Sequence, residues 1–214
     1  MTAALFTGHM LTDPVLQGEI MRRCQAAMIP DEPTSITHDL GLLRLPDGGA
    51  VRVWMIHAAD AVLLDDLGQI ALITRLHDPG RGKQALPGGL LDATPHGPET
   101  SLAAALREAT EETGISPALL KTAGITQLGH RRCQRPFDIR RAWNNLPGTP
   151  IAQGELFTVS TLGFRLRLPG DLRDIAFTPG DDATAVDILP AREVTPDRLA
   201  VPDHLDLINE AMRL

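Results

Sequence analysis

The sequence predicts an α+β fold, an α/β/α sandwich in which a mixed central sheet lies between helices. Short apolar runs separated by turn signals predict hairpin strands. Amphipathic segments of helical period occur between these runs and at the end of the chain. This mixture is typical of a sheet covered by helices on both faces. The 214 residues suffice for one domain with an appendage.

The composition is that of an ordinary globular protein, with 43% hydrophobic and 22% charged residues. Neither a signal peptide nor an apolar run long enough for a membrane span is apparent, so we expect a cytoplasmic protein without membrane contact. The net charge of −7 argues against sequence-independent binding of nucleic acid. Cys24 and Cys133 lack metal-site spacing and are expected to be reduced thiols, with a disulfide as the less favoured alternative.

Residues 1–48 are predicted to be an N-terminal extension. It packs either on the main domain, residues 49–214, or on a second subunit of a homodimer. Within the extension, residues 18–28 are expected to form a short helix that Pro30 ends. A turn signal at residues 45–49 precedes the first convincing strand.

The main domain is expected to alternate strands and helices. The pentapeptide DDLGQ joins two apolar runs and predicts a hairpin. Gly114 is expected to end the central helix in the left-handed conformation. Expected strands cover residues 50–57, 61–64, 70–74, 123–130, 156–166 and 184–189, and expected helices cover residues 99–113, a short stretch from Ser116, and residues 203–214.

The central helix is unusually acidic on one face. Glu108, Glu111 and Glu112 are spaced i, i+3 and i+4, so their carboxylates project together. Arg107 offsets only part of their repulsion, and an oxygen-only anionic cluster is what magnesium requires. The helix alone leaves two interpretations, a metal site or a solvated acidic face. The buried stripe is expected to comprise Leu102, Leu106, Ala109 and Thr113.

The residues around this helix resemble the Nudix box. Gly88 and Gly89 supply its glycine pair, Glu99 its first glutamate, and residues 107–115 (REATEETGI) its second half. The second half matches at every defining position. The first half is stretched, because nine residues separate Gly89 from Glu99 where the family usually has five. The resemblance implies a Nudix-like sandwich fold and hydrolysis of a diphosphate bridge.

The resemblance also implies roles for single residues. Glu111 and Glu112 would be the principal ligands of Mg²⁺, or of Mn²⁺ in its place, with Glu108 as a further ligand or water-orienting group. The backbone carbonyl of Gly89 would complete the metal shell, and Arg107 would orient the glutamates. The metal would neutralise the diphosphate and activate a bound water.

An arginine-rich segment interrupts the acidic chain. Residues 130–141 contain five arginines and the single acid Asp138, which indicates either an anionic ligand or a solvated loop. The run from Asp138 to Arg140, followed by Ala142 and Trp143, resembles a D-P-R and A-W pattern of the ADP-ribose pyrophosphatase branch, with Ile139 in place of proline.

That branch resemblance implies substrate contacts. Arg140 would pair with a phosphate, and Asp138 would accept a hydrogen bond from a ribose hydroxyl. Trp143 would stack on the base, although a buried core tryptophan is the more frequent case. A later G-D-D-A turn resembles the same branch. Its Asp181 and Asp182 would be late metal ligands or a general base, or else ordinary turn residues.

The sequence therefore predicts a Nudix pyrophosphohydrolase that acts on a small nucleotide and converts ADP-ribose to AMP and ribose 5-phosphate with magnesium. One alternative is a Nudix hydrolase of NADH, a sugar nucleotide or a nucleoside triphosphate. Another is a catalytically silent ADP-ribose-binding module, against which the intact glutamates and Arg107 argue.

Overall fold

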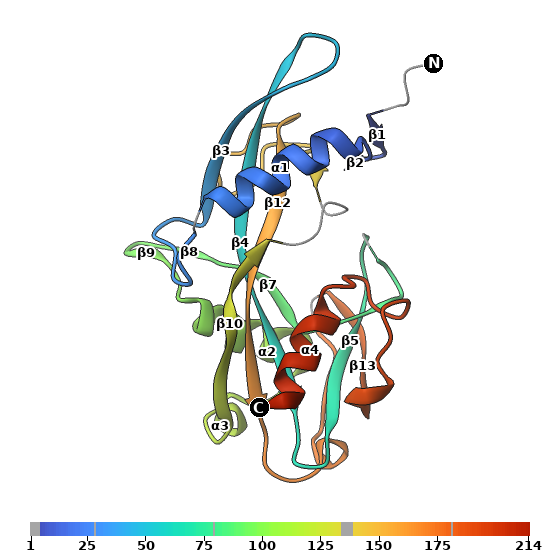
Figure 1. Cartoon of the computed structure of the whole chain (residues 1–214). Helices are drawn as coiled ribbons and strands as arrows, with labels where there is room; N and C mark the ends of the chain where they lie inside the picture. The colour runs from blue at the N-terminus through green and yellow to red at the C-terminus, as the bar shows by residue number, and fades with distance from the viewer. Residues whose placement is uncertain (1–4, 28, 79, 134–138, 181) are drawn as a thin grey trace. The chain divides into compact units, whose positions relative to one another are not determined.

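The computed structural model describes residues 5–27, 29–78, 80–133, 139–180 and 182–214 (Figure 1). The chain divides into two compact units. Unit 1 comprises Met1–Ala58, Leu90–Glu99 and Arg131–Thr161, and unit 2 comprises Ala59–Gly89, Thr100–His130 and Leu162–Leu214. The strands β4 (Ala50–Leu64), β10 (Gly124–Cys133) and β12 (Leu156–Arg167) contribute residues to both units.

Unit 1 is a sheet with one helix packed on it. Its hydrogen-bonded order is β1 (Phe6–Thr7), β2 (Met10–Leu11), β11 (Arg140–Arg141), β12 and β4. The strand β3 (Thr37–Arg44) pairs antiparallel with β4. The helix α1 (Pro14–Ala26) packs on β3, where its buried face joins Leu43, Val53 and Met55 in a common core (Figure 1).

The first helix begins earlier than the sequence pattern indicated. It starts at Pro14 rather than at Gly18, because the Asp13 side chain accepts hydrogen bonds from the backbone N–H groups of Val15 and Leu16 at 2.9 Å. A proline in the first turn lacks only an N–H that has no helical partner there. The N-cap therefore adds a turn that periodicity alone did not reveal.

Unit 2 contains the strands that continue the sheet beyond β4, together with three of the helices. The strands β4, β5 (Gln69–Arg75) and β13 (Ala183–Pro190) are neighbours in that order, and β6 (Gln84–Ala85) pairs with β5. The predicted hairpin is confirmed, with Leu63 opposite Ala71. The helices are α2 (Ser101–Thr113), α3 (Pro117–Leu120) and α4 (His204–Arg213), with 3-10 turns at Leu172–Asp174 and Ala191–Glu193.

The core of unit 2 lies between α4 and the strands. Leu207, Ile208 and Ala211 pack against a cluster that includes Ile70 and Leu72. None of the helices in the described part of the chain is long and apolar enough to cross a membrane.

Three features differ from the expected elements. The runs at residues 50–57 and 61–64 form one continuous strand, β4, in place of two strands. The strand β3 was not anticipated. The four extra residues of the glycine-to-glutamate loop lie in a small hairpin in unit 1, β8 (Ala93–Thr94) with β9 (Gly97–Pro98). At its base, Glu99 accepts from the Asp92 N–H at 2.9 Å, so the insertion closes on itself.

Candidate active site

The helix α2 is fixed at both ends by its own sequence. Thr100 caps its N-terminus by accepting a hydrogen bond from Ala103 N at 3.2 Å. Gly114 ends it with φ of +67°, and a Cβ there would lie 2.7 Å from Thr178 O. Glycine is thus needed for both the left-handed conformation and the close approach.

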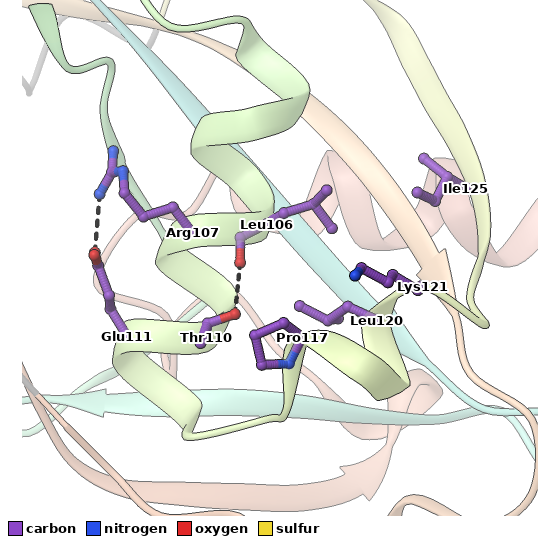
Figure 2. A pocket seen from close by; sticks show the side chains of 8 residues that line it. All are labelled: Leu106, Arg107, Thr110, Glu111, Pro117, Leu120, Lys121 and Ile125. Atoms are coloured by element: carbon purple, nitrogen blue, oxygen red, sulfur yellow. Dashed lines mark hydrogen bonds and ion pairs between the residues drawn. The ribbon is translucent and has the colours of Figure 1, made fainter. Parts of the chain in front are cut away.

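The buried face of α2 agrees with the predicted stripe at Ala109 and Thr113, but Leu102 and Leu106 are only partly buried. Ala105 and Ala109 are buried, and Glu112, seven residues after Ala105, continues the same stripe with 4% exposure. Leu106, predicted to be buried, instead lines a cleft of about 440 Å³ beside α3 (Figure 2). The three glutamates therefore do not share one environment, because Glu112 points inward and the Glu111 side chain is 41% exposed.

Arg107 holds the other two glutamates. Its Nη1 donates to Glu108 Oε1 at 2.7 Å and to Glu111 Oε2 at 2.9 Å, the latter visible as a dashed line in Figure 2. One guanidinium thus offsets the repulsion between two carboxylates and restricts their orientation. This is the contact that an orienting role for Arg107 requires.

The backbone of the glycine pair forms a hydrogen bond with Glu112. Its Oε2 accepts a hydrogen bond from Gly88 N at 3.0 Å. Burial raises the pKa of Glu112 to about 8, and the negative charges of Glu108 and Asp182 add to the rise, while the Gly88 N–H and the positive charge of Arg75 oppose it. A cation bound beside this carboxyl would favour its ionised form.

The strand β7 (Gly88–Leu90) carries the glycine pair, and a Cβ at either position would collide with a neighbouring carboxylate. A Cβ on Gly88 would lie 2.2 Å from Asp60 Oδ1, and one on Gly89 would lie 2.2 Å from Glu108 Oε1. The backbone of Gly89 therefore runs directly against the Glu108 carboxylate. This close approach is the physical reason for two consecutive glycines.

Two buried polar residues near the glycine pair, Asp60 and His204, were not predicted from the sequence. Asp60 is 5% exposed within the apolar part of β4, and His204 is 5% exposed at the start of α4. His204 Nδ1 accepts from Leu86 N at 3.0 Å, and its Nε2 lies 3.7 Å from Asp60 Oδ1. A single acid inside an otherwise apolar strand was the available signal.

The G-D-D-A turn lies against the C-terminal end of α2. Gly180 N donates to Glu112 O at 3.3 Å, and a Cβ on Gly180 would lie 2.5 Å from Glu111 O. Asp182 is exposed, and its Oδ1 is 3.6 Å from His77 Nε2. The structure thus brings Asp182 within electrostatic range of Glu112. Asp181 lies outside the described residues.

The arginine-rich segment belongs to unit 1, and Asp138 lies outside the described residues. Arg131 has a structural role, because its guanidinium donates hydrogen bonds to the carbonyl oxygens of Ala58 and Ser160 at 2.8 and 3.0 Å. Arg140 is half-buried in β11.

Trp143 is not a core residue, and the frequency-based expectation of burial is wrong here. The side chain is 68% exposed. One face of its indole stacks on the His9 ring, with centroids 3.1 Å apart and planes at 22°.

The donor set of unit 2 fits a hard divalent cation. Carboxylates of Glu108 and Glu112 flank the backbone of the glycine pair, and oxygen donors of this kind suit magnesium or manganese. Within the described part of the chain, no three His, Cys, Asp or Glu side chains converge in a ready-made ligand group.

Fold and site together define an α+β protein whose glycine pair faces a carboxylate-bearing helix. The model of the NUDIX domain family matches residues 55–203. This match covers more than half of the chain, and the chain therefore belongs to the Nudix hydrolase family.

Several solved structures of Nudix proteins are similar to this chain at low sequence identity. The NUDIX domain of Shewanella oneidensis NrtR, complexed with ADP ribose, is 23% identical with a TM-score of 0.51, over 74% of this chain and 87% of that chain. A NUDIX hydrolase from Nitrosomonas europaea is 19% identical with a TM-score of 0.45, over 80% and 88%. The Nudix hydrolase RenU from M. smegmatis is 20% identical with a TM-score of 0.44, over 81% and 94%. A search of curated protein sequences finds no match. The predicted α+β Nudix fold is confirmed.

Proposed function

We propose that this Nudix protein is a magnesium-dependent pyrophosphohydrolase that converts ADP-ribose to AMP and ribose 5-phosphate. The observation that carries the catalytic part is the arrangement of Glu112, Arg107 and the glycine pair. A buried carboxyl beside a glycine pair that approaches carboxylates closely, with two further carboxylates held by one arginine, suits a cation and a diphosphate.

Each residue of this arrangement has a separate part. Glu112, Glu111 and Glu108 would hold the metal, with the Gly89 carbonyl as a further oxygen donor. When bound, the metal supplies charge neutralisation of the diphosphate and a more acidic water. Arg107 restricts the rotamers of Glu108 and Glu111, so that their oxygens are positioned before substrate arrives. Asp182 remains the proposed late ligand or general base, together with Asp181.

The substrate assignment rests on the residue pattern of unit 1 and on the Gly-Asp-Asp turn. Trp143 presents an exposed indole that is already stacked on one side by His9, which suits base stacking on the other side. Arg140 is proposed to pair with phosphate and Asp138 with a ribose hydroxyl. The NrtR domain was solved with ADP ribose, but at 23% identity it supports the fold alone.

Assays with a panel of substrates separate the three candidate functions. The protein is incubated with Mg²⁺ and, in turn, ADP-ribose, NADH, a sugar nucleotide and a nucleoside triphosphate, and products are identified by chromatography. We expect AMP and ribose 5-phosphate from ADP-ribose, and no turnover after chelation of the metal. Preferred turnover of another nucleotide would replace the substrate assignment. Tight binding of ADP-ribose without turnover would favour a silent module.

A variant tests the substrate part separately. Trp143→Ala is expected to raise KM for ADP-ribose about tenfold with little change in kcat, because stacking on a base is worth about 1–3 kcal/mol. An unchanged KM would remove Trp143 from the substrate site and leave the metal assignment intact.

A cytoplasmic location, a homodimer and the role of residues 1–48 as an extension remain proposals.

A further inference from the structure

The only two cysteines of the chain meet in unit 1. Cys24 lies on α1 and Cys133 is the last residue of β10. Both are free, both line one cavity of about 340 Å³, and Cys133 packs against the core cluster that contains Cys24. Residues so distant in sequence come together only through the fold, which is why their spacing gave no sign of a pair.

The two thiols have different environments. Cys24 is 4% exposed and belongs to the core beneath α1, whereas Cys133 is partly exposed. The neighbouring Cys24 thiol and the positive charge of Arg131 lower the pKa of Cys133 against the opposing effect of burial, and the neighbouring Cys133 together with burial raises the pKa of Cys24. Since the thiolate is the nucleophile, the more exposed Cys133 is the candidate for the reactive member of the pair.

The cavity offers a route to Cys133. Arg131 and Arg132 line it beside the thiol, and Ser160 adds a hydroxyl. Met55 places a third sulfur 3.5 Å from Cys133 Sγ. If both cysteines acted only as small apolar residues, Cys133 would be expected inside the core with Cys24, without two arginines on the same cavity wall.

We propose that Cys24 and Cys133 are a peroxide-reactive thiol pair that closes to an intramolecular disulfide. The Cys133 thiolate attacks one oxygen of a hydroperoxide, the O–O bond breaks, and Cys133 becomes a sulfenic acid while the hydroperoxide leaves as an alcohol, or as water from hydrogen peroxide, after taking up a proton. The Cys24 thiol then attacks the Cys133 sulfur, the S–O bond breaks, and water leaves. Two electrons pass from the thiol pair to the peroxide, and α1 becomes covalently joined to β10.

Mass spectrometry of the full-length protein tests the pair directly. The reduced protein is treated with hydrogen peroxide, quenched and alkylated under denaturing conditions. We expect a mass loss of two hydrogens, protection of both cysteines, one cross-linked peptide pair, and a higher melting temperature. Free cysteine in the same tube serves as the control for peroxide activity. Disulfide-linked dimers would overturn the proposal. Thiols that can still be alkylated after the free cysteine has been oxidised would also overturn it.

Two variants test the order of events. In Cys24→Ala, Cys133 should accumulate sulfenic acid that a dimedone-type probe traps, because no neighbouring thiol remains to resolve it. In Cys133→Ala, Cys24 should stay reduced and react with iodoacetamide at least about tenfold more slowly than Cys133 does in Cys24→Ala. Melting curves show that each variant is folded. If either fails to fold, alkylation rates of the two cysteines in the wild-type protein give the same test. Faster alkylation of Cys24 than of Cys133 contradicts the assigned roles.

Discussion

Glu112 in unit 2 and His57 in unit 1 are both buried ionisable side chains, with 4% and 1% exposure, yet their pKa values move in opposite directions. Burial raises the pKa of Glu112 to about 8. Burial lowers the pKa of His57 to about 3, and the positive charge of Arg131 and of His38 contributes. In both cases loss of hydration disfavours the charged form, so each group is neutral near pH 7.

The difference between them lies in what surrounds each group. His57 Nδ1 has a partner in the Ser160 hydroxyl at 2.7 Å, and the neighbouring charge is positive. Glu112 has one hydrogen bond from Gly88, and Glu108 and Asp182 add negative charge, against the positive charge of Arg75. The imidazole of His57 has a polar partner within the protein, whereas the surroundings of Glu112 are those that we propose for a cation. A displaced pKa therefore indicates a functional site only together with the sign of the surrounding charge.

The largest expected effect comes from Glu112→Gln. The amide keeps the shape and can still accept from Gly88 N, but it cannot supply negative charge to a metal. We expect kcat to fall at least about a hundredfold, because even residues behind metal ligands cost 10–100-fold when changed. Steady-state kinetics with ADP-ribose and Mg²⁺ measures this. The exposed Glu193→Gln is the matched control, with unchanged kcat. Wild-type turnover in Glu112→Gln would remove Glu112 from the metal site.

His57→Leu should instead affect stability. The substitution leaves the Ser160 hydroxyl without its imidazole partner, which costs about 1–3 kcal/mol in the free energy of unfolding. Urea titration measures the loss. The kcat of the folded variant, assayed well below its melting temperature, should match the wild type. A stable variant with impaired kcat would show that His57 belongs with Glu112 rather than contrasting with it.

The pH dependence of stability in the metal-free protein should show both groups. The folded state retains the Glu112 proton up to pH about 8, whereas the unfolded chain loses it near 4.5, so stability falls as pH rises through this window. The unfolded chain protonates His57 near 6.5 and the folded state only near 3, so stability falls as pH drops through that window. Within its window, each group changes the equilibrium constant of folding about tenfold per pH unit.

The two windows overlap between pH 4.5 and 6.5, where these contributions cancel. Melting temperatures should therefore be nearly level in that range and should fall on both sides. Glu112→Gln should abolish the fall above pH 6.5, and His57→Leu should abolish the fall below pH 4.5. The opposite assignment of either slope would contradict the corresponding pKa direction.

The sequence predicted the parts of the site that depend on local order. The helix expected over residues 99–113 forms at residues 101–113, and its end at Gly114 and the contact of Arg107 with the glutamates follow from periodicity and motif spacing. Even there, spacing did not reveal that Glu112 is buried. Of the expected stripe, Ala109 and Thr113 are buried, whereas Leu102 is only partly buried and Leu106 lines the α3 cleft.

Contacts between side chains that are far apart in the sequence could not be predicted. Asp60 meets His204, and Cys24 meets Cys133, only because strands and helices far apart in the chain pack together. Trp143 likewise stacks on His9, which is far from it in the sequence of unit 1. Local patterns carry no information about such partners.

The smallest effect concerns the proton of Glu112 when metal binds. Because Glu112 is protonated at pH 7 and a metal ligand must be deprotonated, Mg²⁺ binding should release about one proton at pH 7 and almost none at pH 9. Calorimetry in two buffers of different ionisation enthalpy measures this release, and pH 9 serves as the internal control. His57 should contribute nothing, since it is already neutral at both pH values. Binding without proton release at pH 7 would mean that the cation is held by Glu108 and Glu111 while Glu112 stays protonated, and the contrast between the two buried groups would then lose its functional meaning.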